Sequence, residues 1–173
     1  LTPFRVREVL LIASQFDRYL LEESGHLAEI LQEEYTVLNL SQAPRIIHSP
    51  DAKDAIELVS SRKFDLVITM SKVGKMDVYE LARKLKKIED GMPVVMLSQN
   101  TRELATLRTG DGIDRIFVWS GDSRILLSIC KLIEDEKNVE NDVREGDVQV
   151  ILLVEDSRRF YSAYLPLLYT QLV

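Results

Sequence analysis

The chain has 173 residues, of which 46% are hydrophobic and 29% are charged, and its net charge is −6. This composition predicts one globular domain with an appendage; the negative charge disfavours broad contact with nucleic-acid backbones, and no apolar run approaches the roughly 20 residues that span a membrane. Cys130 is the single cysteine, which excludes an internal disulfide and favours the reducing cytoplasm. With only two histidines beside it, the sequence has no zinc-site spacing.

Short apolar runs recur between Val9 and Val118. Runs that do not alternate with polar residues are typical of parallel strands that are covered on both faces. The predicted strands are residues 9–13, 45–48, 64–70, 93–97 and 116–118.

The segments between these runs have apolar residues at helical spacing. Ser49 is expected to be an N-cap with Pro50 at the first helical position, and Asp77 is expected to cap the third helix. The alternation of strands and helices predicts an α/β fold with a doubly wound sheet. The predicted helices are residues 16–34, 50–62, 78–87, 101–108 and 123–136.

The C-terminal part changes in character after residue 136. Residues 137–147 are polar and highly charged, which predicts a linker. Residues 148–156 then repeat the opening pattern of an apolar strand, this time ending in Glu155 and Asp156, and a helix with apolar residues follows. Because this strand and helix have no sheet of their own to cover, we expect them to pack on the first domain or to pair with a second copy of the chain.

Two short motifs resemble a known family. Asp65-Leu66-Val67 and Met76-Asp77-Val78 resemble the start of the third strand and the start of the third helix in response-regulator (CheY-like) receiver domains, and Pro93 and Ser98 match that family at the fourth strand. The resemblance covers about residues 8–136, and the predicted receiver-like domain is residues 1–136. It implies a flavodoxin-like α/β/α fold with a five-stranded parallel sheet in the order 2-1-3-4-5.

The resemblance also shows what this chain lacks. Receivers have an acidic pair that binds magnesium after the first strand, and here the pair is replaced by Ser14 and Gln15. The aspartate that accepts the phosphoryl group is replaced by Met70, and the lysine after the fifth strand by Trp119, whereas Ser98 is retained. This set implies a degenerate receiver that has no catalytic residue, phosphoacceptor or cofactor in its first domain.

The same family pattern applies to the end of the chain. Residues 148–173 resemble the first strand and first helix of a second, truncated receiver, in which Glu155 and Asp156 would bind magnesium if the domain were intact. The sequence of residues 159–173 also resembles response-regulator-like proteins that carry a domain similar to phosphoenolpyruvate synthase or pyruvate phosphate dikinase.

These observations predict a non-enzymatic interaction module in a two-component, phosphorelay-type signalling protein. Its expected partners are other domains of the same polypeptide or a signalling protein, with a homodimer through the C-terminal strand and helix as a further possibility, and with no nucleic acid or membrane. One alternative is a conventional receiver whose phosphoacceptor site lies in the second domain. The other is a small-molecule-binding flavodoxin-like module that regulates a phosphoenolpyruvate synthase-like enzyme.

Overall fold

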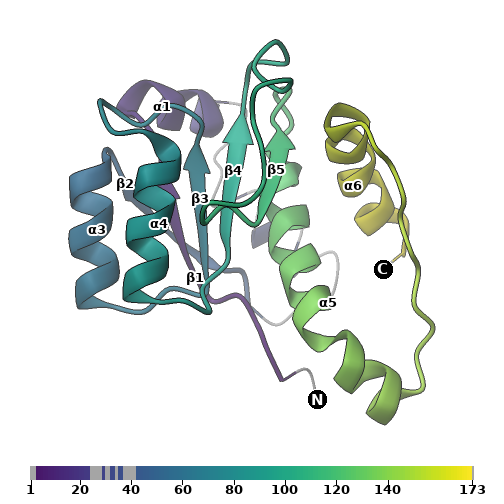
Figure 1. The fold of residues 1–173 in the computed structure, drawn as a ribbon. Coiled ribbons are helices and arrows are strands. Elements are labelled where there is room, and N and C mark those ends of the chain that lie inside the picture. Colours follow the sequence, from purple (N-terminus) through teal and green to yellow (C-terminus); the bar gives the residue numbers. More distant parts are fainter. Residues whose placement is uncertain (1–2, 24–28, 30–31, 34, 37–41, 173) are drawn as a thin grey trace.

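The computed structural model describes residues 3–23, 29, 32–33, 35–36 and 42–172. Five parallel strands form one sheet in the order β2-β1-β3-β4-β5 (Figure 1). This order confirms the predicted flavodoxin-like fold. The strands are β1 (Glu8–Ile12), β2 (Arg45–Ser49), β3 (Leu66–Met70), β4 (Val94–Ser98) and β5 (Arg115–Val118).

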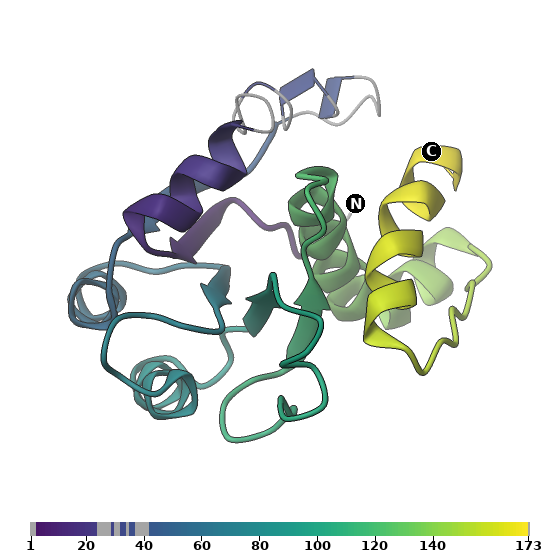
Figure 2. The same ribbon diagram turned by 90° about the horizontal axis from the view of Figure 1, so that it is seen from above.

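Helices cover both faces of the sheet. α3 (Ala52–Ser61) and α4 (Val78–Ile88) lie on one face, and α1 (Gln15–Glu23) and α5 (Arg124–Gly146) lie on the other (Figures 1 and 2). Every residue of β3 and β4 is buried. This double coverage explains why the two strands are apolar along their whole length. Of the first predicted helix, residues 16–34, α1 accounts for the part up to Glu23, and most of the remainder lies outside the described residues.

The helix caps follow the sequence in one case and shift in another. Asp77 accepts hydrogen bonds from the backbone N–H groups of Tyr79 and Glu80, as predicted for the cap of α4. The prediction for α3 was wrong by two residues: Asp51 is its N-cap and accepts from the Asp54 N–H. The Ser49 hydroxyl instead donates to the Asp51 carbonyl oxygen, because the chain is still extended at Asp51.

The predicted fourth helix does not form, and residues 101–106 are a series of turns. Contacts with distant segments explain this difference. Arg158 Nη1 donates to the carbonyl oxygens of Leu104 and Leu107, at 3.1 and 2.7 Å. These carbonyl groups are therefore satisfied without further helical turns.

α5 is longer than predicted and continues to Gly146, so the expected linker over residues 137–147 is mostly helical. The N-terminal segment holds this extension. Phe4 and Asn138 exchange hydrogen bonds of 2.9 and 2.8 Å, and the Val6 N–H donates to Glu134 Oε1 at 2.9 Å. These partners are more than 120 residues apart in the sequence. The charged composition of residues 137–147 alone therefore could not predict that the helix continues through them.

The end of the chain forms a helix without its predicted strand. α6 (Arg158–Leu172) packs against β5 and α5, which confirms that the helix covers the first domain. Residues 147–157 form no strand. The reason is that α6 covers the outer edge of β5, where the Val118 N–H donates to the Ser162 hydroxyl at 2.8 Å. The segment therefore has no sheet edge to join in this part of the molecule.

Candidate functional site

Four of the five degenerate-site residues lie at, or just after, the carboxyl ends of neighbouring strands. Met70 pairs with Leu97 in the β3–β4 ladder, and Ser98 pairs with Val118 in the β4–β5 ladder. Ser14 lies two residues after β1, and Trp119 directly follows β5. The carboxyl ends of parallel strands form the binding edge of such sheets, so the register places these positions where a ligand would be held.

Ser14 and Gln15 begin α1 and do not form a cation site. The Ser14 hydroxyl donates to Asp17 Oδ2 at 2.7 Å, and the Asp17 N–H donates back to the Ser14 hydroxyl oxygen at 3.0 Å. This reciprocal pair is an N-terminal cap of the helix. Asp17 Oδ1 also accepts from Gln99 Nε2 at 3.4 Å. The Ser-x-x-Asp spacing was the sequence signal for this cap, and the sequence reasoning missed it.

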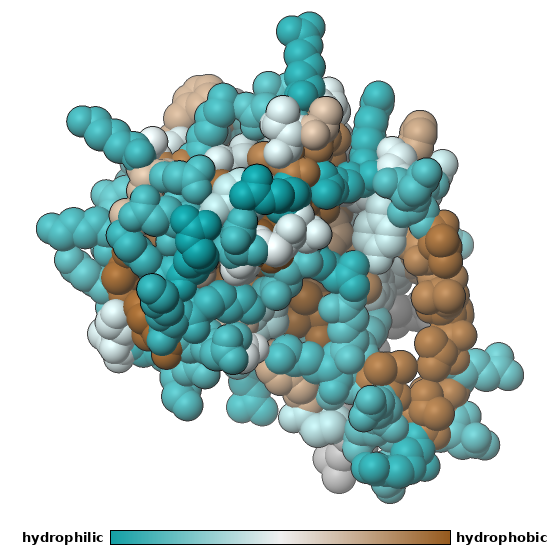
Figure 3. Space-filling view, in the orientation of Figure 1, coloured by the Kyte–Doolittle hydropathy of each residue, from teal (hydrophilic) through white to brown (hydrophobic). Residues whose placement is uncertain are grey.

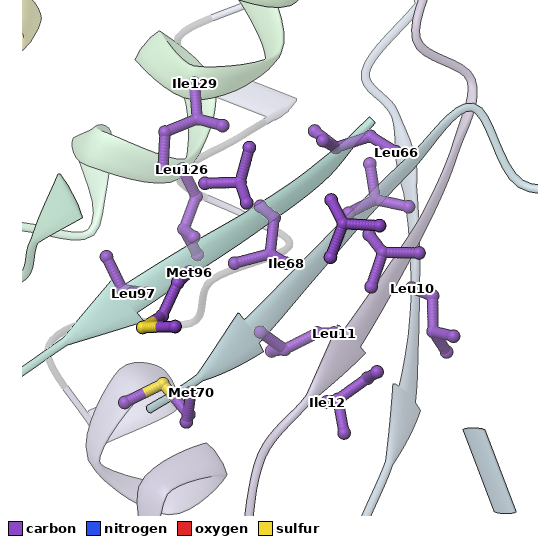
Figure 4. Close-up of a cluster of buried hydrophobic side chains, with 14 of the residues drawn as sticks. Leu10, Leu11, Ile12, Leu66, Ile68, Met70, Met96, Leu97, Leu126 and Ile129 are labelled. Atoms are coloured by element: carbon purple, nitrogen blue, oxygen red, sulfur yellow. The ribbon is translucent and has the colours of Figure 1, made fainter. Parts of the chain in front are cut away.

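Met70 is part of the apolar core. Its side chain is 4% exposed and lies among buried residues of the central strands, including Leu97 (Figure 4). A thioether cannot serve as the phosphoacceptor, because its sulfur has no proton to lose and its phosphoryl adduct would be an unstable sulfonium. A carboxylate in these surroundings would lose its hydration without gaining a partner. The position therefore provides packing and no nucleophile.

Ser98 has its hydrogen-bonding capacity occupied. It is fully buried, its hydroxyl donates to the Asn100 carbonyl oxygen at 3.3 Å, and it accepts from the Asn100 N–H at 3.2 Å. The hydroxyl thus stabilises the turn after β4. A phosphoryl oxygen could bind this group only if that turn opened.

Glu103 forms a charged contact at this edge that the sequence reasoning missed. The Ser71 hydroxyl donates to Glu103 Oε2 at 3.2 Å, and Lys72 Nζ lies 2.7 Å from Glu103 Oε1. The hydrogen bond from Lys72 holds the pKa of the Glu103 carboxyl below its usual range. Both oxygens of this carboxylate are therefore engaged, and no motif marked the pair because its members come from two different loops.

Trp119 stands where receivers have a lysine. Its ring is half-buried against the core, and its indole Nε1 is buried with no hydrogen-bond partner in the described part of the chain. Its backbone N–H donates to the Ser98 carbonyl oxygen at 2.9 Å. The Arg124 guanidinium donates to both carboxylate oxygens of Asp122, which lowers the pKa of Asp122.

The residues at this edge do not fit a magnesium ion. Ser14 and Gln15 offer no carboxylate, and Asp17 is held by Ser14 and Gln99. In the described ranges, no group of three or more His, Cys, Asp or Glu side chains is placed to hold a metal. Among the described residues, the carboxylates of Asp17 and Glu103 at these strand ends are each held by neighbouring side chains.

Glu155 and Asp156, the other predicted metal ligands, lie away from this edge. Glu155 lines a cavity of about 200 Å³ beside β5 together with Arg115, Arg158 and Tyr161. Its Oε1 accepts from the Ser157 N–H at 2.9 Å. Magnesium binding by this pair in an intact second domain stays a prediction.

α6 packs on the surface that β5 and α5 form, away from the strand ends described above. Tyr161 contacts the ring of Phe117, with ring centroids 6.1 Å apart, and Leu165 is 3% exposed. The Tyr169 hydroxyl donates to Asp135 Oδ2 of α5 at 2.6 Å. Together with the Val118–Ser162 bond, these contacts fix the helix on the surface from both ends.

No protein-family model matches the chain, and no curated protein matches it. Solved structures of receiver domains and of a response regulator do match. One from Methanospirillum hungatei is 20% identical with a TM-score of 0.59, covering 78% of this chain and 98% of that one. The chemotaxis response regulator CheY4 of Vibrio cholerae is 17% identical with a TM-score of 0.56, covering 74% and 98%.

The third is the signal receiver domain of an HD domain-containing protein from Pseudomonas fluorescens, which is 22% identical with a TM-score of 0.54 and covers 82% and 96%. At these identities the likeness establishes the fold. The chain therefore has the CheY-like receiver fold. In the described residues, no helix is long and apolar enough to cross a membrane.

Proposed function

We propose that residues 1–136 are a degenerate receiver that serves signal transduction through protein contacts and is not itself phosphorylated. The observation that carries this proposal is the burial of Met70 at the carboxyl end of β3, where the fold would present an acceptor aspartate. It rests on the receiver fold and on the side chains that replace the phosphorylation site.

The charges at the carboxyl ends of the strands support the proposal that this domain is not phosphorylated. Phosphoryl transfer needs a nucleophile together with positive charge that neutralises the transferred group, supplied largely by a metal ion. The carboxylates present, Asp17 and Glu103, are each engaged by neighbouring side chains. A dianionic phosphoryl group brought to this edge would meet these negative charges without a compensating metal.

The contacts of α6 support an interaction role for the β5–α5 surface. This helix buries Leu165 on that surface and forms hydrogen bonds with both β5 and α5. We infer that other domains of the same polypeptide, or a signalling partner protein, regulate this module through the same surface. Trp119 and the Asp122–Arg124 pair lie next to it in sequence and provide an aromatic and a charged group for such contacts.

Treatment with magnesium and beryllofluoride, which mimics a bound phosphoryl group, tests this proposal. We expect the amide NMR signals of Met70, Ser98 and Trp119 to remain unchanged, and acetyl phosphate to add no phosphoryl group to the intact mass. A receiver with a complete acidic pair and acceptor aspartate serves as the positive control. Magnesium-dependent shifts around Met70, or a phosphorylated species of this chain, would refute the proposal.

A further inference from the structure

The segment between α5 and α6 exposes an unusual amount of apolar surface. Leu152 and Val154 are 82% and 80% exposed, and Ile151 is 67% exposed. Figure 3 shows a hydrophobic strip along the side of the molecule where, in Figure 1, the segment between α5 and α6 runs. Large contiguous apolar patches of this kind mark surfaces that are covered in a complex.

The backbone of the same segment also lacks pairing. Residues 147–157 form no β ladder, although the sequence from Val148 to Val154 has the composition of a strand. An extended apolar segment with unpaired backbone groups is a template for strand addition. The outer edge of β5 cannot supply the partner because α6 covers it.

Asp147 marks a hinge at the start of this segment. It terminates α5 with φ of 50°, a left-handed conformation that side chains other than glycine adopt at a cost. This residue reverses the chain, so that the segment runs back beside α5 towards the start of α6 (Figure 1). If Asp147 became extended, the segment would lead away from its own α5 and carry α6 with it.

We propose that two copies of this chain form a dimer by exchanging α6, with residues 148–154 of the two copies paired as antiparallel strands. Each α6 would occupy the β5–α5 surface of the other copy through the contacts that it now makes within one chain. The exchange adds a new interface without losing the docking contacts. It also brings Val150, Leu152 and Val154 of the two copies together on one face of the ribbon and pairs the backbone groups that face the partner strand.

The charge pattern is compatible with this pairing. With Leu152 opposite its counterpart, Val150 lies opposite Val154, and Glu155 lies opposite Gln149 of the other copy. The acidic residues therefore do not face each other, which avoids the repulsion between like charges at directly opposed positions.

Hinge variants provide the test, with size-exclusion chromatography and light scattering over a range of protein concentrations. Asp147→Gly relieves the left-handed hinge and favours the monomer, whereas Asp147→Thr disfavours that conformation and favours the dimer; both variants lose the same charge. Because each dimer opens two hinges, we expect the dissociation constant of Asp147→Thr to be at least about tenfold lower than that of Asp147→Gly. A dimer that forms equally in both variants would show simple side-by-side association and exclude exchange.

A second pair of variants tests the strand contact. Leu152→Glu, in the exposed segment, should abolish the dimer without changing the folded monomer. Leu167→Glu is the matched control, because Leu167 is an exposed apolar residue of α6, 54% accessible, outside the segment. A protein that stays monomeric at all concentrations, including in Asp147→Thr, or a dimer that survives Leu152→Glu, contradicts the proposal. This inference is independent of phosphorylation.

Discussion

Met70 lies where a receiver would carry its acceptor, and its surroundings suit a thioether and not a carboxylate. The side chain is almost fully buried among apolar residues of adjacent strands. The neighbouring polar groups are already used: Ser98 closes a turn, and Ser14 caps α1. At the scale of single residues, these side chains form core, turn and capping contacts.

Replacing Met70 by aspartate should therefore destabilise the protein. The change removes buried apolar surface and places a carboxyl group where no hydrogen-bond donor or cation compensates it, so we expect the free energy of unfolding to fall by about 3–5 kcal/mol at pH 7. Burial raises the pKa of an introduced carboxyl, and the loss should therefore be smaller near pH 4, where the group is protonated. Urea denaturation at both pH values measures this.

Met70→Leu is the control for that experiment. It conserves volume and apolar character, and its cost should stay below about 1.5 kcal/mol at either pH. If Met70→Asp were as stable as the unmodified protein at pH 7, the position would be accessible to solvent or to a cation, and the interpretation of this edge as apolar core would be wrong.

The Asp122–Arg124 pair gives a small pH-dependent contribution. The Arg124 guanidinium holds the pKa of Asp122 below its ordinary value, so the pair stabilises the fold above the unfolded-state pKa of aspartate and loses this effect as the pH falls through the lowered pKa. We expect Asp122→Asn to be slightly less stable than the parent at pH 7 and to lose this difference in acid. Unfolding curves at a series of pH values would show an unchanged difference if the pair were not formed.

At the scale of elements, the central strands and α4 could be predicted because local sequence determines them. β3 and β4 are apolar throughout since both faces are covered, and Asp77 marks the start of α4 by its own hydrogen bonds. The elements that could not be predicted depend on distant partners. Residues 101–106 form turns whose carbonyl groups bind Arg158, and α5 is extended by contacts with Phe4 and Val6.

The candidate site likewise has a part that the sequence could predict and a part that it could not. Its position followed from the order of strands, so the sequence could assign Ser14, Met70, Ser98 and Trp119 to the carboxyl ends of their strands. The contact of Glu103 with Lys72 could not be predicted, because neither residue belongs to a motif and the loop between β4 and β5 was expected to be helical. The strand expected at 148–154 failed because strand formation requires a partner edge as well as a favourable sequence.

The substitution Gly112→Ala tests how closely the β4–β5 loop approaches α4. The φ of Gly112 is 92°, and an added Cβ would lie 2.8 Å from the Ala82 carbonyl carbon and 2.9 Å from the Arg83 nitrogen. Both atoms belong to helical backbone and cannot move aside cheaply, so we expect Gly112→Ala to lower the free energy of unfolding by more than about 2 kcal/mol. Thermal denaturation provides the measurement.

Gly91→Ala is the matched control, because an added Cβ there meets nothing within 4 Å and the residue does not have a left-handed φ. We expect this change to be neutral within about 0.5 kcal/mol. Equal effects of the two substitutions would contradict the close packing of the loop against α4.

At the scale of the whole molecule, the chain combines the CheY-like receiver fold with uncharged side chains at the strand ends and a β5–α5 surface that already carries a helix. The sheet order and the covering helices confirm the fold. The uncharged replacements at the strand ends carry the proposal that signalling here works through contacts. In this account the information passes through the occupancy of a surface and not through a covalent modification.

The most direct test is to restore the missing groups together. A variant with Ser14→Asp, Gln15→Asp, Met70→Asp and Trp119→Lys supplies the acidic pair, the acceptor and the cation, and circular dichroism first checks that it is folded. If the chain is a receiver whose chemistry was lost at these positions, magnesium and beryllofluoride will shift the amide NMR signals at the strand ends of the restored variant and leave the unmodified protein unchanged. Binding by the unmodified protein, or no binding by a folded restored variant, would contradict this account.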